Sequence, residues 1–250
     1  MIVPTYNERD RLSELVGAIF ESAGTAGIEL ELVVVDDNSP DGTGAIADDL
    51  ARTHRMKVIH RSGKLGLGTA VVAGFGAASA DVVGVMDADF SHPPSLVPRM
   101  LAVFRSTGAD VLVASRYVPG GSTPNWPFKR KMLSRLGCLL ARGLSPIRDA
   151  ASGFFLIRRS IAQTVTIKAG GFKICLELIV RGRPGHLVEI PYRFDDRELG
   201  ESKMSLREAS GYLVQLKDLY LERLTGGAGS GRRYQQLSST EVERTLQAAR

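Results

Sequence analysis

No stretch of the sequence reaches the roughly 18–20 consecutive apolar residues that a helix needs to cross a bilayer. The first residues, MIVPTYNERD, also lack the basic-then-apolar order of a secretory signal. Cysteine is scarce: Cys138 and Cys175 are far apart and match no metal-binding spacing, which is typical of a protein from a reducing compartment. We therefore expect a cytoplasmic protein whose own chain does not span a membrane.

Aromatic residues make up only 6% of the chain, and the basic residues do not interleave with them. This argues against nucleic-acid binding, which combines cationic side chains with stacking aromatic rings. The formal net charge of +5 suggests an anionic partner but does not identify one. With 44% hydrophobic and 24% charged residues, the 250-residue chain has an ordinary globular composition, with room for one α/β domain or two small ones.

The first 115 residues alternate between short apolar segments and segments with helical periodicity. Leu12, Leu15 and Ile19, for example, recur at the spacing of one helix face. The expected strands cover residues 2–4, 29–37, 57–60, 81–89 and 109–116, and the expected helices cover residues 8–24, 41–53, 68–80 and 95–108. Continuous apolar strands separated by helices predict an α/β fold with a doubly wound, mostly parallel sheet.

This rhythm changes after Arg116. The sequence predicts a loop over 117–127, helices over 128–144, 174–182 and 205–224, and a strand over 186–194. The glycine-rich segment 225–233 has the composition of a flexible linker. We therefore expect one domain over 1–224 and a flexible linker and tail over 225–250, the tail being either a short helix or disordered.

Two carboxylates end the fourth expected strand, in the sequence VVGVMDADFSHPP (82–94). On a strand, Asp87 and Asp89 would project from the same side, where a proton or a cation must relieve their repulsion. Pro93 and Pro94 cannot join a central ladder, so the backbone should leave the sheet there. The pair would then stand at the carboxyl end of a strand, where open parallel sheets bind ligands. The alternative is a solvated acidic turn.

Polar residues also follow the first two strands, in PTYNE (4–8) and DDNSPDG (36–42). Because the carboxyl ends of parallel strands share one edge, Glu8 and Asp37 would join the twin carboxylates there. Together they would accept hydrogen bonds from nucleoside hydroxyl groups or hold a divalent cation. Turn and helix-cap chemistry is an equal alternative for Asp36 and Asp37.

The segment KLGLGTA (64–70) matches a dinucleotide-binding turn only in part. Gly66 and Gly68 lie between a strand and a helix, but the third glycine position is Val71 and no acidic residue follows at the ribose-binding distance. A dinucleotide-dependent oxidoreductase is therefore disfavoured. We expect a tight turn in which Lys64 contacts a phosphate.

Six motifs, in the same order, carry a resemblance to a known family. They are PTYNE (4–8), VVVDDNSPDGT (33–43), KLGLGTA (64–70), MDADFSHPP (86–94), ASRYVPGG (114–121) and ELGESKMS (198–205). Over residues 1–224 the chain resembles the polyprenyl-phosphate sugar transferases, which are inverting family-2 glycosyltransferases of the GT-A, Rossmann-like fold. It is most similar to the dolichol-phosphate mannose synthases. The resemblance implies transfer of mannose from GDP-mannose to dolichyl or polyprenyl phosphate, with Mg²⁺ or Mn²⁺ as cofactor.

The resemblance also implies roles for individual residues. The nucleotide-sugar donor would contact Pro4, Tyr6, Glu8, Val35, Asp37, Lys64, Asp87, Ala88, Asp89, Arg116, Lys173, Arg197 and Lys203. The metal ion would be held by Asp87, Asp89 and Ser91, and the catalytic residues would be Asp87, Asp89 and Arg116. The acceptor phosphate would meet Arg116, Arg130 and Ser152.

Some positions depart from the family pattern. Ser91 stands where many relatives have Gln, and Phe155 where a polar or basic residue is common. Many relatives also carry transmembrane helices, so a separate subunit would anchor this chain. His92 favours the mannose branch over the nearest alternative, a transferase that uses UDP-glucose or another UDP-sugar. An alternative from another class is a nucleotide-binding module without turnover, against which the set of retained charged residues argues.

A lipid phosphate acceptor changes what the catalytic site must supply. The second pKa of a phosphate monoester is about 6, so an oxyanion is already present at neutral pH and no general base is required. The site would instead align this oxygen with the anomeric carbon and stabilise the leaving diphosphate.

The expected helix over 128–144 has a leucine stripe and a basic cluster, formed by Lys129, Arg130, Lys131 and Arg135. Both are typical of a helix at a membrane interface. The alternative is an ordinary packed helix with a solvated basic face, and core packing is favoured for the apolar stripe of 205–224. A polyprenyl acceptor would place the protein peripherally on the cytoplasmic face of a membrane.

Overall fold

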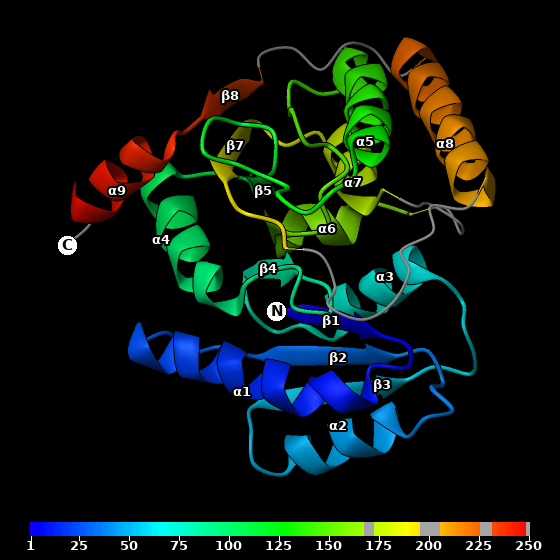
Figure 1. Ribbon diagram of the computed structural model, residues 1–250, viewed down its shortest axis with the longest axis vertical. Helices are drawn as coiled ribbons and strands as arrows, with labels where there is room; N and C mark the ends of the chain where they lie inside the picture. The colour runs from blue at the N-terminus through cyan, green and yellow to red at the C-terminus, as the bar shows by residue number, and fades with distance from the viewer. Residues whose placement is uncertain (168–172, 196–205, 226–231, 249–250) are drawn as a thin grey trace.

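The computed structural model describes residues 1–167, 173–195, 206–225 and 232–248 (Figure 1). The strands in these ranges form one eight-stranded sheet in the order β3-β2-β1-β4-β6-β5-β7-β8. They are β1 (Ile2–Thr5), β2 (Leu32–Asp36), β3 (Met56–His60), β4 (Val82–Val85), β5 (Val111–Ser115), β6 (Phe155–Arg158), β7 (His186–Pro191) and β8 (Arg233–Gln236). Only β6 runs antiparallel to its neighbours, β4 and β5. The predicted mostly parallel sheet is confirmed.

Helices flank this sheet, and all but the short α6 lie close to positions that the sequence predicted or allowed. They are α1 (Arg9–Thr25), α2 (Thr43–Ala51), α3 (Leu67–Ala77), α4 (Val97–Thr107), α5 (Phe128–Leu140), α6 (Arg159–Thr164), α7 (Ile174–Gly182), α8 (Leu206–Thr225) and α9 (Ser239–Ala248), with 3₁₀ turns η1 (Pro94–Leu96) and η2 (Ala141–Gly143). Figure 1 shows α1 and α2 at one end of the molecule and α5 next to α8 at the other. The hydroxyl of Tyr212 in α8 donates to the carbonyl of Gly137 in α5 over 2.8 Å, which ties these two helices together.

The core is divided by the sheet into two layers. Every residue of β2 is buried. Val33 and Val35 pack into one apolar cluster, whereas Leu32 and Val34 pack into the other, because successive strand side chains point to opposite faces. A strand covered on both faces needs apolar residues at every position, which is why β2 is a continuous apolar run.

Small residues let α3 lie close to the first strand. A Cβ atom added at Gly74 would stand 2.5 Å from the Cγ2 atom of Ile2, closer than packed carbon atoms allow. The glycine and alanine content of α3 therefore sets the separation between this helix and the sheet.

The fourth strand is shorter than predicted. The expected strand over 81–89 is observed only as Val82–Val85, so Asp87 and Asp89 follow the strand and are placed by a loop, not by strand alternation. The ladder ends because the next backbone amide after Met86, that of Asp87, donates to the imidazole of His92. The expectation that the pair lies beyond the carboxyl end of a strand holds.

Part of the expected linker and tail over 225–250 has regular structure that the sequence did not reveal. β8 pairs with β7 in parallel, from His186–Arg233 to Glu189–Gln236. α9 buries Val242, and Arg99 of α4 forms an ion pair with Glu243 of α9. The short helix was one of the two expected states of the tail, and sheet pairing holds the strand that precedes it. β6 was also missed, because no alternating pattern marks its four residues.

Candidate active site

The predicted donor residues of the first two strands meet at the carboxyl edge of the sheet. Pro4 and Val35 are direct neighbours in the β1–β2 register. Beyond the strand ends, the Lys64 ammonium lies 3.9 Å from the centroid of the Tyr6 ring. Glu8 begins α1, and its amide donates to the Thr43 hydroxyl at the start of α2 over 3.0 Å. Segments far apart in the sequence thus form one surface here.

The adjacent residues Asp36 and Asp37, at the end of β2, have different bonding partners. Asp36 accepts hydrogen bonds from the Thr5 hydroxyl and from the Ser39 hydroxyl and amide, which is the turn chemistry weighed above. Asp37 instead forms an ion pair with Arg61, with 2.8 Å between its Oδ1 and Nη1 of Arg61, and both side chains are 8% exposed. The donor role predicted for Asp37 therefore involves a partner that sequence reasoning missed. The signal available was a basic residue directly after the third strand.

Backbone strain gathers at this same edge. Asn7, Asn38 and Phe90 follow β1, β2 and β4, and each adopts a left-handed conformation with φ of 59°, 58° and 62°. Asparagine tolerates this region, but a phenylalanine there costs of order 1 kcal/mol or more. The surrounding contacts must hold Phe90 in place, and they turn the chain directly after Asp89.

Two hydrogen bonds orient the carboxylate of Asp89. The hydroxyl and the amide of Ser91 both donate to Oδ1 of Asp89, over 2.5 Å and 3.0 Å. Asp89 and Ser91 are buried, as is Ala88, whereas the side chain of Asp87 is 39% exposed. Ser91 therefore positions Asp89, and the metal-ligand role predicted for Ser91 stays a prediction.

The ring of His92 contacts Asp87 through both of its nitrogen atoms. Its Nδ1 accepts the amide proton of Asp87 over 2.9 Å, and its Nε2 lies 3.9 Å from Asp87 Oδ2. The ring stacks on Phe154, with 4.9 Å between centroids. Burial lowers the pKa of His92, although the carboxylates of Asp87 and Asp89 act in the opposite direction. A neutral ring that accepts at Nδ1 carries its proton on Nε2, facing Asp87.

Arg116 is the most strongly held cation of the site. Its Nε and Nη2 donate to the two carboxylate oxygens of Asp149, each over 2.7 Å, and its backbone amide adds a third bond of 2.9 Å. Asp149 is fully buried, and the amide of Asp149 in turn donates to Glu189. Although burial acts to lower it, the pKa of Arg116 is raised by Asp149. Arg116 stays charged in the interior because this partner neutralises it.

Aromatic rings cover the other side of Arg116. Its guanidinium lies 5.1 Å from the Trp126 ring and 5.6 Å from the Phe194 ring. The predicted acceptor residue Arg130 lies 4.0 Å from the same Trp126 ring, so one indole contacts both cations. Sequence reasoning missed Trp126, which is the single tryptophan of the chain and lies in the segment predicted as a loop.

A small cavity of about 110 Å³ opens beside Asp87 and is also lined by Ser152, Gly153 and Lys173. A Cβ atom at Gly153 would stand 3.3 Å from the His92 ring and 3.6 Å from Asp87 Oδ1, so a larger residue would crowd this ring. Lys173 begins α7, and its pKa is lowered by burial and by the charge of Arg116. The hydroxyl of Ser152 donates to the Ala114 carbonyl over 2.7 Å, which anchors the cavity wall.

The structure therefore brings most of the predicted site residues to one edge of the sheet. Arg197 and Lys203 lie outside the described residues. Within the described ranges, no three potential side-chain ligands of the His, Cys, Asp and Glu types gather around one point.

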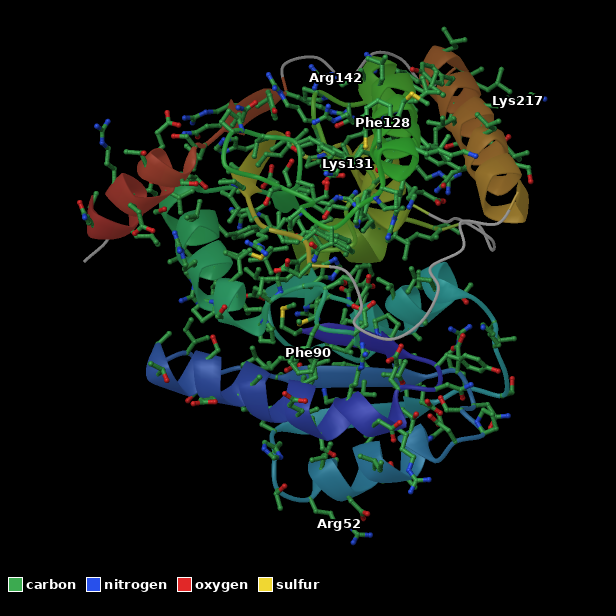
Figure 2. The ribbon with its side chains drawn as sticks, viewed as in Figure 1. Arg52, Phe90, Phe128, Lys131, Arg142 and Lys217 are labelled. Atoms are coloured by element: carbon green, nitrogen blue, oxygen red, sulfur yellow. The ribbon has the colours of Figure 1, made fainter. Side chains whose placement is uncertain are left out.

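The apolar side chains of α5 largely face solvent (Figure 2). Phe128 is 81% exposed and Leu139 66%, and the same face presents Met132, Leu133, Leu136 and Leu140. On α8, Leu213, Val214, Leu221 and Leu224 are exposed, whereas Leu216 and Leu219 are buried in the core. Both helices thus have exposed apolar faces. No helix in the described part of the chain is both long enough and apolar enough to span a bilayer.

Comparison with known proteins gives three results. The family model described as "Glycosyl transferase family 2" matches residues 1–176. A dolichol-phosphate mannosyltransferase of Pyrococcus furiosus is 41% identical over 217 residues, which cover 85% of this chain but only 61% of that protein. A polyprenol monophosphomannose synthase of Mycolicibacterium smegmatis is 40% identical over 224 residues, covering 84% of this chain and 83% of that protein.

Two solved structures share the fold at low sequence identity. A mannosyltransferase from Pyrobaculum calidifontis in complex with GDP-Man and Mn²⁺ has a TM-score of 0.62 at 17% identity, covering 99% of this chain and 72% of that one. Glucosyl-3-phosphoglycerate synthase from Mycobacterium tuberculosis, in complex with Mn²⁺, UDP and phosphoglyceric acid, has a TM-score of 0.64 at 19% identity, with coverages of 88% and 76%. Both support the glycosyltransferase fold.

Proposed function

Because the chain belongs to glycosyl transferase family 2, we propose that it transfers mannose from GDP-mannose to a polyprenyl phosphate such as dolichyl phosphate, with inversion at the anomeric carbon. The observation that carries the proposal is the cavity lined by both Asp87 and Lys173, within electrostatic reach of the Arg116–Asp149 pair. Such a site combines ligands for a cation with positive charge for phosphates. Relatives that are about 40% identical and are named for this transfer support the sugar and the acceptor.

The nucleotide would bind along β1 and β2. Asp37 offers carboxylate oxygens to the base or ribose, and its ion pair with Arg61 keeps it oriented. Lys64, which stacks on the Tyr6 ring, would supply positive charge to the diphosphate. Pro4, Glu8 and Val35 would form the wall around the guanosine.

The donor set at the end of β4 fits a divalent cation. Asp87 and Asp89 provide hard carboxylate oxygens, Ser91 holds Asp89 in one orientation, and His92 holds the backbone at Asp87. Mg²⁺ or Mn²⁺ would supply charge neutralisation of the departing diphosphate when bound there. The protein's own part is to hold the backbone at Asp87 and the carboxylate of Asp89 in place.

The acceptor phosphate oxygen would attack the anomeric carbon as the bond from that carbon to the diphosphate breaks, and GDP leaves. No side chain needs to remove a proton, since the lipid phosphate is already an oxyanion at neutral pH. Arg116 and Arg130, which share the Trp126 ring, would hold this phosphate in line, with Lys173 and the Ser152 wall on the cavity side. A single displacement converts an α-linked donor into a β-linked product.

The acceptor's polyprenyl tail would remain in a bilayer, so the enzyme would work at the surface of a membrane, which we place on its cytoplasmic side. The exposed apolar faces of α5 and α8 and the basic residues of α5 support peripheral docking there. A separate membrane-anchoring subunit would then add to the membrane affinity that these exposed faces provide.

The test is to incubate the protein with Mg²⁺ or Mn²⁺, a short polyprenyl phosphate and a panel of GDP- and UDP-sugars. We expect GDP-mannose to yield a polyprenyl-phosphate mannose whose anomeric coupling in NMR spectra shows the β configuration. Selective use of UDP-glucose would instead establish the alternative donor. Donor binding without transfer to any acceptor would indicate a nucleotide-binding module and contradict the proposal.

A further inference from the structure

A second, larger cavity lies at the opposite edge of the sheet from the candidate active site. Its volume is about 440 Å³, and it shares no lining residue with the cavity beside Asp87. Arg183 and Arg232, which line it, lie just before the amino ends of the parallel strands β7 and β8. The turn over residues 142–146 and the carboxyl ends of α7 and α8 complete its wall. Figure 2 shows Arg142, in the turn after α5, at the far end of the molecule from Arg52 of the α2 region.

Positive charge dominates the lining of this arginine cavity. The lining arginines are Arg142, Arg181, Arg183, Arg223 and Arg232, and the lining carboxylate is Glu222 alone. Both carboxylate oxygens of Glu222 accept hydrogen bonds from Arg181, each over 2.9 Å, and Glu177 also pairs with Arg181. The lining therefore carries an excess of positive side chains, and Arg181 already engages its one carboxylate.

Three of the arginines are held by neutral partners. Arg142, Arg223 and Arg232 donate to carbonyls of the turn over residues 143–146, namely those of Pro146, Gly143 and Leu144. Within the described part of the chain, none of these three forms an ion pair. The Nε atom of Arg232 is buried and has no hydrogen-bond partner there. The side chain of Arg232 is half-buried, so its charge is partly removed from water beside a carbonyl and not a carboxylate.

Local electrostatics do not remove this excess. Burial lowers the pKa of Arg232, and the nearby charges of Arg223 and Arg183 lower it further. The carboxyl ends of α7 and α8 each contribute about half a negative charge, which offsets only part of the three positive charges of Arg142, Arg223 and Arg232. Arg183 also adopts a left-handed conformation with φ of 48°, which is unfavourable for a residue with a Cβ atom.

We propose that the arginine cavity is a second ligand site, which binds a phosphate group carried by an organic molecule. Guanidinium groups match phosphate oxygens with paired N–H donors, and a phosphate supplies the one to two negative charges that the lining lacks. A volume of 440 Å³ falls in the range of roughly 300–1,000 Å³ that holds organic ligands, so the site has room for a substituent on the phosphate. Leu224, next to Arg223, is 81% exposed, so a lipid headgroup and a soluble phosphate ester are both sterically compatible sources.

The test compares wild type with the variant R142Q/R223Q, which removes two exposed arginines of the cavity. The matched control is R52Q/R55Q, which removes two exposed arginines near α2. One probe is flotation with phosphatidylcholine vesicles that either contain or lack phosphatidic acid. The other is calorimetry with glycerol 3-phosphate in solution. Neither readout needs sugar transfer, so the result does not depend on the proposed function.

Wild type and the control should bind at least one of the two phosphate probes, and R142Q/R223Q should bind it roughly tenfold or more weakly. Binding of glycerol 3-phosphate would identify a soluble ester as a source, and binding to phosphatidic acid alone would identify a lipid headgroup. Absence of binding to both probes, or equal weakening in both variants, would overturn the proposal. Circular dichroism checks folding, and if the double variant is unfolded, R142Q alone is measured against R52Q with the same expected direction.

Discussion

The guanidinium of Arg116 donates hydrogen bonds to both carboxylate oxygens of Asp149, with Nε–Oδ2 and Nη2–Oδ1 distances of 2.7 Å. The two side chains are 8% and 0% exposed, so neither charge is solvated by water. Replacement of Asp149 by Asn leaves Arg116 buried without its counter-charge. We expect D149N to lower the free energy of unfolding by about 3–5 kcal/mol in urea denaturation.

The reference for that prediction is R116M/D149L, which removes both charges. It should be more stable than D149N, because no uncompensated charge remains in the interior. If D149N unfolds like wild type, the pair does not hold this part of the molecule together.

Asp89→Asn should abolish most of the proposed transfer. Loss of a carboxylate from a two-carboxylate cation site removes several kcal/mol of transition-state stabilisation, so kcat/KM for GDP-mannose should fall by about 100-fold or more. The control is Asp81→Asn, a fully exposed aspartate in the turn before the same strand. Turnover of D89N close to that of wild type, at equal thermal stability, would be incompatible with the cation assignment.

Stability should depend on pH through Glu31. Burial raises the pKa of this carboxyl, but hydrogen bonds from Lys57 and Ser79 outweigh it and lower the pKa from 4.5 to about 2. As the pH falls, the Glu31 carboxylate is therefore protonated in the unfolded chain before it is protonated in the folded protein. The stabilisation from this group is complete above about pH 4.5 and is lost as the pH falls to about 2.

The measurement is the free energy of unfolding across this acidic range. Wild type should lose more stability than Glu31→Gln, whereas Glu29→Gln, which changes a neighbouring surface carboxylate, should follow wild type. Parallel profiles for wild type and Glu31→Gln would contradict the assignment.

The exposed face of α5 should determine membrane association. L136S/L139S changes side chains that are 50% and 66% exposed, so we expect weaker flotation with anionic vesicles and a change in unfolding free energy within about 0.5 kcal/mol per site. The variant Leu219→Ala on α8 is the control, in which a buried leucine is changed instead of an exposed one. Its side chain is fully buried, so the variant should lose about 2–5 kcal/mol of stability and, while folded, float like wild type. Unchanged flotation of L136S/L139S would favour an ordinary packed helix.

The C-terminal segment should contribute to stability. Leu237 and Val242 are 4% and 2% exposed and pack into the same core cluster as α1 and α4. We expect Leu237→Ala to cost about 2–5 kcal/mol in denaturant unfolding. Leu224→Ala, at a site that is 81% exposed, serves as the control and should be nearly neutral. Equal stability of the two variants would mean that β8 and α9 do not pack on the domain in solution.

Local sequence patterns predicted the parallel half of the sheet well. The β1–α1–β2–α2–β3 order follows from apolar runs and helical periodicity, both of which report burial of a continuous face. Three elements escaped this reasoning, namely the short helix α6 and the strands β6 and β8. β6 is four residues long, and β8, with the sequence RYQQ, is polar; both are strands because neighbouring strands offer hydrogen bonds, which a local pattern does not record.

For the candidate site, the sequence by itself determined which chemical groups stand at which strand ends: the carboxylates at the ends of β2 and β4, and the cations at 64 and 116. Only the tertiary structure decided which partner each of these groups has. Asp37 forms an ion pair with Arg61, and Arg116 forms one with Asp149. Asp36 accepts hydrogen bonds within a turn, and Asp89 accepts them from Ser91. The physical reason is that residue type and spacing specify charge and local backbone preference. The partner of a charge depends on which distant segments the packed core brings within about 3 Å of it.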